Sequence, residues 1–227
     1  EADCAMAAAQ LAAVPARLRT LPGNHDVGDP GAAAQPPTAT RLARHERHFG
    51  PATWTEDRPG WRLLGLNSQV IGTGEPADAA QHAAITEALA TLGERRLAVF
   101  LHKPMFLDAV EEGPVGYWAV PPEARQPLRP LLEHPNLRLI GSGHLHLWRI
   151  ASHRRATLAW APATSFTLGP RLMPEPRGAE RQLGVLRHLF HEDAVETEFL
   201  PIPGAERLVL DEMAEQIYPP APAAAGS

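Results

Sequence analysis

The chain has 227 residues, of which 44% are hydrophobic and 21% are charged. This is the usage of a folded globular protein, and with Cys4 as the only cysteine it excludes a disulfide scaffold as well as wholesale disorder. The charges, 21 basic against 26 acidic residues, are scattered along the chain and give a net charge of -5. This pattern indicates no nucleic-acid partner, and no run approaches the ~20 apolar residues of a membrane span.

The domain organisation is predicted to be simple. Residues 1–218 are expected to form one domain, and residues 219–227 (PPAPAAAGS) have the composition of a disordered tail. The sequence shows no signal peptide, which favours a cytoplasmic location. Because Glu1 is not an initiator residue, a signal peptide further upstream stays open.

The first half of the chain is predicted to alternate helices and strands. The alanine-rich residues 2–14 predict a helix that ends at Pro15. A short strand is expected over residues 17–21, and a short helix over 39–49 that ends near a Gly-Pro pair. Continuous apolar runs predict buried strands over 61–67 and 96–101, with a helix over 79–92 between them.

The second half is predicted to contain more strands than helices. A long irregular connection, residues 103–122, leads to a helix over 123–132 and a short strand over 137–140. Further strands are expected over 148–150, 156–160, 183–190 and 195–200, mostly joined without helices. This order predicts an α/β layered fold with a mixed sheet.

Three polar motifs lie just past the ends of predicted strands, where open α/β sheets usually bind their ligands. They are Gly-Asn-His-Asp at residues 23–26, His102 at the end of an apolar strand, and Gly-His-Leu-His at residues 143–146. Imidazole nitrogens and amide oxygens are ligands for divalent zinc, manganese and iron. In an extended stretch, residues two apart point to the same side, so His144 and His146 are expected to face one pocket.

These motifs, in this order, resemble the last three motifs of the calcineurin-like metallophosphoesterases. The resemblance implies a layered α/β/β/α sandwich with mixed sheets and a centre of two divalent metal ions (Mn, Fe or Zn). It implies that Asn24, His102 and His144 ligate one metal and that His146 ligates the other. The expected substrate is a small phosphate mono- or diester, attacked by a metal-activated hydroxide.

The same resemblance implies the acid that completes the reaction. His25 would be the general acid that protonates the leaving alkoxide, and Asp26 would fix the tautomer and orientation of His25. An imidazole with a pKa near 6.5 can supply such a proton at neutral pH.

The sequence departs from the family at its beginning. The family series starts with Asp-x-His and Gly-Asp motifs, but no Asp-x-His occurs here and the only Gly-Asp, residues 28–29, follows the Asn-His-Asp motif. The resemblance therefore implies an N-terminally truncated domain without the carboxylate ligands. We expect at most one weakly bound metal in this chain, and impaired activity, because every remaining ligand is neutral.

Two alternatives stay open at this point. The first is a non-catalytic binding or regulatory domain that keeps the fold with a vacant metal centre. The second concerns the connection after His102, where Tyr117 or Trp118 is predicted to border the substrate pocket or, instead, to anchor the loop to the body of the domain.

Overall fold

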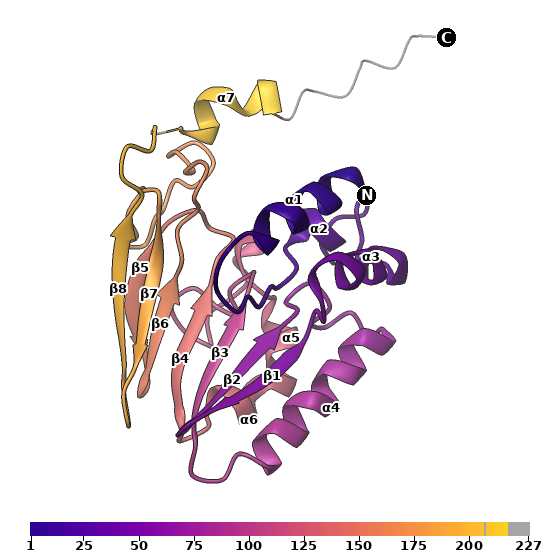
Figure 1. The fold of residues 1–227 in the computed structure, drawn as a ribbon, viewed down its shortest axis with the longest axis vertical. Coiled ribbons are helices and arrows are strands. Elements are labelled where there is room, and N and C mark those ends of the chain that lie inside the picture. The colour runs from indigo at the N-terminus through magenta and orange to yellow at the C-terminus, as the bar shows by residue number, and fades with distance from the viewer. Residues whose placement is uncertain (207, 218–227) are drawn as a thin grey trace.

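A computed structural model describes residues 1–206 and 208–217, so the predicted tail at 219–227 lies outside the described residues. The centre is a six-stranded sheet with the order β1-β2-β3-β4-β6-β5 (Figure 1). The strands are β1 (Trp54–Arg58), β2 (Trp61–Leu66), β3 (Arg96–Leu101), β4 (Leu137–Ser142), β5 (Arg149–His153) and β6 (Ala156–Trp160). Strands β2, β3, β4 and β6 are parallel, and the edge strands β1 and β5 pair antiparallel, so the sheet is mixed.

Helices cover one face of this sheet. They are α4 (Pro76–Ala90), α5 (Pro122–Arg125), the 3-10 turn η2 (Gln126–Leu128) and α6 (Arg129–Leu132) (Figure 1). Leu64 and Val99 of the sheet share one buried cluster with Ile85 and Leu131 of the helices. The continuous apolar runs in the sequence are explained by this burial, since central parallel strands are covered on both faces.

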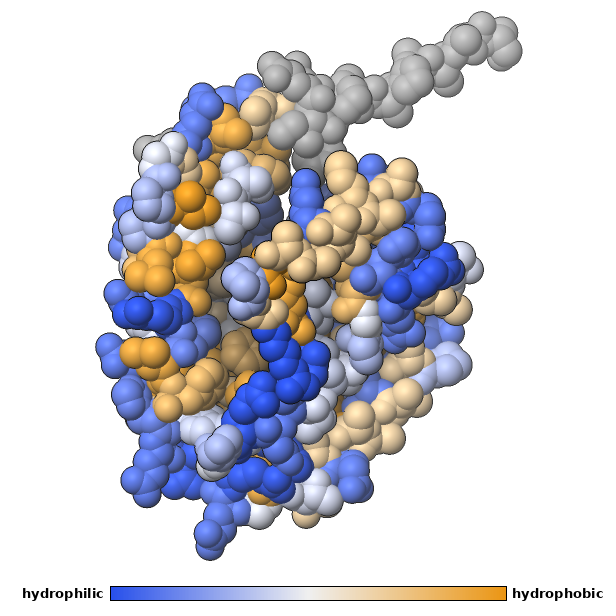
Figure 2. Space-filling view, viewed as in Figure 1, coloured by the Kyte–Doolittle hydropathy of each residue, from blue (hydrophilic) through white to orange (hydrophobic). Residues whose placement is uncertain are grey.

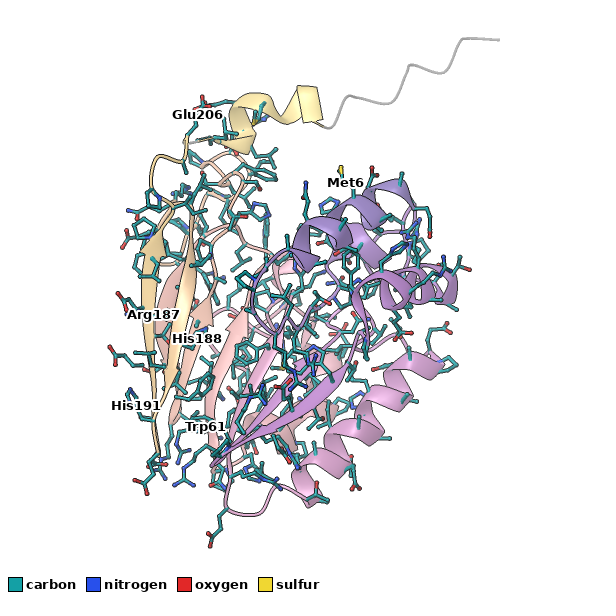
Figure 3. All side chains as sticks on the ribbon, in the orientation of Figure 1. Met6, Trp61, Arg187, His188, His191 and Glu206 are labelled. Atoms are coloured by element: carbon teal, nitrogen blue, oxygen red, sulfur yellow. The ribbon has the colours of Figure 1, made fainter. Side chains whose placement is uncertain are left out.

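A hairpin of two strands, β7 (Gly184–Phe190) and β8 (Val195–Pro201), covers the opposite face. Trp61 packs edge to face on Phe190 with ring centroids 4.8 Å apart. His188 faces the larger sheet, while Arg187 lies on the outer side of β7 and pairs with Glu198 (Figure 3). The chain is therefore an α/β sandwich with a mixed sheet, as predicted.

Three N-terminal helices lie near the end of the sheet where the parallel strands finish: α1 (Ala2–Ala12), α2 (Asn24–Val27) and α3 (Ala39–Phe49) (Figure 1). Helix α1 has no buried residue and forms a pale apolar strip on the surface (Figure 2). Met6, 60% exposed, points away from the domain (Figure 3). Within the described residues, no helix combines the length and apolarity that crossing a bilayer requires.

The prediction of a strand over residues 17–21 is wrong. This segment runs across β1 without joining a strand ladder. It is held by side chains instead: Trp54 Nε1 donates to the Thr20 carbonyl oxygen at 3.0 Å, and Arg19 contacts Glu56 at 2.9 Å. A β-strand is defined by backbone pairing with a neighbour, and the local sequence alone does not supply that neighbour.

Other differences have local causes. The helix predicted over 123–132 is broken into α5, η2 and α6, since Pro127 and Pro130 lack the N–H that a continuous helix needs. Strand β1 was missed because Trp54-Thr-Glu-Asp-Arg58 is mostly charged or polar, as edge strands often are. A C-terminal helix, α7 (Leu210–Ile217), was also not anticipated.

Candidate active site

The candidate site lies at the edge of the sheet where the parallel strands end. His102 follows directly after β3, and residues 143–146 follow β4, its parallel neighbour. The Gly143 N–H donates to the His102 carbonyl oxygen at 2.9 Å, which ties the two strand ends together. Helix α2, which begins at Asn24, reaches the same place from the N-terminal region. Parallel pairing thus brings together motifs that are far apart in the sequence.

Three of the predicted ligand residues are in contact. Asn24 Oδ1 lies 3.0 Å from His102 Nε2, and His102 Nε2 lies 3.2 Å from His144 Nδ1. The two imidazole rings are 5.0 Å apart, centroid to centroid. Gly23 allows this approach, because a Cβ there would lie 3.0 Å from His102 Cε1.

Backbone carbonyls determine which nitrogens of the two later histidines carry a proton. His144 Nε2 is 3.0 Å from the Tyr117 carbonyl oxygen, and His146 Nδ1 is 2.9 Å from that of Phe166. A carbonyl oxygen only accepts hydrogen bonds, so each of these nitrogens is the donor. His144 Nδ1 is left with a lone pair directed at His102, and His146 keeps its lone pair on Nε2. This is how ligating histidines are commonly oriented.

Burial keeps these imidazoles neutral. Burial, followed by the nearby charge of His144, lowers the pKa of His102 to about 3. Burial also lowers the pKa of His144 to about 4, and it lowers that of His146 against the opposing hydrogen bond to Phe166. At neutral pH all three are therefore neutral imidazoles, which is the form that binds metal ions.

The same shifts predict that acid destabilises the fold. A histidine with a folded pKa below its unfolded value of about 6.5 binds fewer protons when folded, so stability is complete at higher pH and falls as pH drops below that value. For His102 and His144 together, the free energy of unfolding should fall by about 2 kcal/mol between pH 6 and pH 5. Urea unfolding in the presence of a chelator would measure this loss, and His102→Asn should reduce the slope by about half.

The backbone around the histidine pair differs from the extended stretch on which the prediction relied. His144 and His146 adopt the left-handed conformation, with φ of 68° and 53°, which is uncommon for residues other than glycine. Leu145 between them is completely buried in the core. Both imidazoles line one cavity, as expected, but by way of two strained residues around a buried leucine.

His25 and Asp26 lie at the rim. His25 is exposed and lines the same cavity as the three ligand candidates. The Asp26 carboxylate accepts a hydrogen bond from the Gly23 N–H at 2.7 Å, so it stabilises the start of α2. A role for Asp26 in orienting His25 stays a prediction.

Tyr117 contributes more to the site than the sequence indicated. Besides the carbonyl contact to His144, its hydroxyl accepts a hydrogen bond from Asn24 Nδ2 at 2.7 Å, which fixes the amide with Oδ1 toward His102. Tyr117 and Trp118 both line the cavity, whose volume is about 670 Å³. The sequence signal for these two residues was the long connection that contains them. The contact from the Tyr117 carbonyl oxygen to His144 could not be predicted, because every residue has a backbone carbonyl.

The donor set fits a divalent metal ion only in part. Metal–ligand bonds of about 2.0–2.2 Å place two ligands of one ion roughly 3.0–3.4 Å apart. The 3.0 Å and 3.2 Å separations between Asn24, His102 and His144 match this spacing. In the part of the chain that the structure describes, however, no carboxylate lines the cavity, and no three His, Cys, Asp or Glu side chains form a metal-binding group.

A buried ion pair lies next to the site. Lys103, the only lysine in the chain, contacts Asp29, and the two side chains are 7% and 9% exposed. The ammonium lies 5.1 Å from the centre of the Tyr117 ring, and Asp29 Oδ1 accepts from the Gly31 N–H at 2.9 Å. The pair therefore links the end of β3 to the loop after α2 and to the aromatic wall of the cavity.

These features define a class of protein, an α/β sandwich with an amide–imidazole cavity at the carboxyl ends of its parallel strands. No family model matches the chain, and no curated protein matches it. Among solved structures it resembles a "Putative 5'-Nucleotidase from Staphylococcus aureus" at 13% identity and a TM-score of 0.38. That match covers 70% of this chain and 31% of the other.

Proposed function

We propose that this chain contributes the histidine ligands and the general acid of a metal-dependent phosphoesterase site. The observation that carries the proposal is the contact between Asn24, His102 and His144, which come from three separate segments: Asn24 Oδ1 and His144 Nδ1 lie 3.0 Å and 3.2 Å from His102 Nε2. The neutral state of both buried imidazoles and the proton on His144 Nε2 agree with it. The substrate would be a phosphate mono- or diester.

Each residue has a distinct task in this proposal. A bound divalent ion would stabilise charge on the phosphate oxygens and supply a nucleophile at neutral pH. Asn24, His102 and His144 would hold that ion, and His146 would offer Nε2 to a second one. His25, at the rim, would donate its proton to the departing oxygen. Because no carboxylate lines the cavity among the described residues, we expect weak metal binding and low activity.

Metal titration tests the ligand assignment. His102→Ala should weaken Mn²⁺ or Zn²⁺ binding by at least about 10–100-fold, because losses even in groups that only support ligands reach this size. His188→Ala is a suitable control, since this partly buried imidazole packs on Phe100 and hydrogen bonds Thr197, away from the cavity. Isothermal titration calorimetry would measure both. Equal affinities in the two variants would exclude the assignment.

Hydrolysis tests the function itself. With manganese added, the protein should release phosphate from aryl phosphate mono- or diesters, and chelation should abolish the release. The His102→Ala variant should lose the metal-dependent rate, whereas His188→Ala should keep it. Metal binding without any hydrolysis would reject the phosphoesterase proposal for this chain.

A second candidate function is a non-catalytic domain that binds a regulator or partner. Two observations favour it: Asn24 is satisfied by Tyr117 and His102 without any metal, and the described part of the cavity has no anionic ligand. Under this alternative, His102→Ala would leave metal binding unchanged and would alter stability only. The titration above therefore separates the two candidates.

A further inference from the structure

The cavity has two chemically different halves. The half beside the sheet is polar and contains the amide and imidazoles described above. The other half is apolar, and its described lining comprises Trp118, Phe166, Leu168, Leu172 and Leu210. The halves are continuous, because the rings of His146 and Phe166 lie 4.5 Å apart. Neither an acidic nor a basic side chain lines the apolar half within the described residues.

The apolar wall is built as a defined structure. The Asp211 carboxylate accepts hydrogen bonds from the N–H groups of Gly169 at 2.8 Å, Arg171 at 2.6 Å and Leu172 at 3.3 Å. Three backbone donors on one carboxylate fix the loop that carries Leu168 and Leu172. A Cβ on Gly169 would lie 2.6 Å from Asp211 Cγ, so only glycine permits this contact.

The same clamp holds the C-terminal segment against the loop. Thr167 forms a bridge with Val209, and the Leu210 N–H donates to the Thr167 carbonyl oxygen at 2.9 Å. Leu210, next to Asp211, is thereby buried at 6% exposure and becomes part of the wall. The surface is therefore fixed before any ligand arrives, which lowers the entropic cost of binding.

Aromatic rings from the connection after His102 complete the apolar half. Tyr117 and Trp118 meet edge to face with centroids 5.3 Å apart, and Tyr117 is 47% exposed. Both rings also pack against His144, with centroid-to-centroid distances of 4.6 Å for Tyr117 and 6.0 Å for Trp118. A flat apolar group of a ligand would thus contact the rings and leucines of this half while its phosphate lies at the imidazoles.

We propose that the preferred ligand is a phosphate ester whose alcohol portion carries an uncharged aromatic group, and that this group binds the wall fixed by Asp211. The inference rests on the proposed function for the position of the phosphate. The wall itself adds the substrate class, because binding an apolar group there removes both surfaces from water without leaving any charge unpaired.

The test compares 2-(1-naphthyl)ethyl phosphate with ethyl phosphate, whose leaving alcohols have similar acidity. The naphthyl compound should have a KM about 10- to 100-fold lower, and Leu172→Ala should raise its KM about 10-fold while leaving ethyl phosphate unchanged. Leu189→Ala, an exposed leucine on β7, is the matched control and should have no effect. Equal KM values for the two compounds would overturn the inference.

Binding of 1-naphthol, which lacks a phosphate, separates this inference from the proposed function. Fluorescence titration should show binding that Leu172→Ala weakens, even in a preparation without hydrolytic activity. That result, together with no metal-dependent hydrolysis, would reject the phosphoesterase proposal and retain the apolar site. Hydrolysis of both phosphates with no response to Leu172→Ala would retain the function and reject the substrate class.

Asp211 is a positioning residue in this scheme, and its variants probe the wall without touching the ligand. Asp211→Ala should raise the KM of the naphthyl compound several-fold with kcat unchanged, because the wall loosens while the imidazoles stay in place. Asp211→Asn keeps one acceptor oxygen and should restore part of the loss. A fall in kcat for both phosphates would show that Asp211 acts on the whole domain, against the proposal.

Discussion

Replacing Lys103 with methionine is expected to lower the free energy of unfolding by about 3–5 kcal/mol. The substitution leaves Asp29 buried beneath the site without its countercharge, and an unpaired buried carboxylate is far less stable than a solvated one. The free energy of unfolding of natural domains is only about 5–15 kcal/mol, so this loss would be a substantial share of the total stability. Urea unfolding followed by circular dichroism would measure the change.

Two further variants show whether the ion pair is the cause. Lys103→Met combined with Asp29→Asn removes both charges and should be more stable than Lys103→Met alone, since no buried charge is left unpaired. Arg187→Met removes an ion pair with Glu198 in which both side chains are about half exposed, and should cost less than about 1 kcal/mol. A loss of similar size for Lys103→Met would contradict the structural role of the buried pair.

Replacing His25 with glutamine should slow the metal-dependent hydrolysis of ethyl phosphate by about 100-fold or more. An alkoxide is a poor leaving group and needs a proton, whereas p-nitrophenolate departs without one. The same variant should therefore hydrolyse p-nitrophenyl phosphate at nearly the normal rate. Steady-state kinetics with both substrates would measure the difference, which a purely structural role for His25 would not produce.

The control for this prediction is His191→Gln, which changes an exposed histidine just beyond strand β7. It should leave both rates unchanged. If His25→Gln slowed both substrates to the same extent, His25 would serve binding or metal affinity instead of proton donation. Asp26→Asn would then show whether the start of α2 has to be intact for that role, because the Asp26 carboxylate accepts a hydrogen bond from the Gly23 N–H there.

Much of the fold could be predicted from local patterns. The apolar runs predicted as strands over 61–67 and 96–101 form β2 (Trp61–Leu66) and β3, and the helix predicted over 39–49 has these bounds in α3. These segments were readable because burial on both faces, or capping by Thr38 and Gly50, leaves a direct signature in neighbouring residues. The strand expected over 17–21 and the missed β1 show the limit, because a strand also depends on its partner.

The candidate site, like the fold, was predictable only in part. The residue types that can bind a metal, and their positions after predicted strand ends, are properties of the sequence, and they predict Asn24, His102, His144 and His146 as candidates. Their convergence depends on the parallel order of β3 and β4, which no local pattern specifies. The functions of these residues remain predictions that the titrations and assays above would test.

The sequence alone determined the chemistry available to this protein: amide and imidazole donors, with a further histidine, His25, next to Asn24 in the chain. Only the tertiary structure decided how that chemistry is arranged. The carbonyls of Tyr117 and Phe166 select the histidine tautomers. Asp211 fixes the loop that carries Leu168 and Leu172, although it lies 42 positions after Gly169 in the chain. Such contacts join segments distant in the chain, and backbone atoms make many of them, so side-chain identity does not encode them locally.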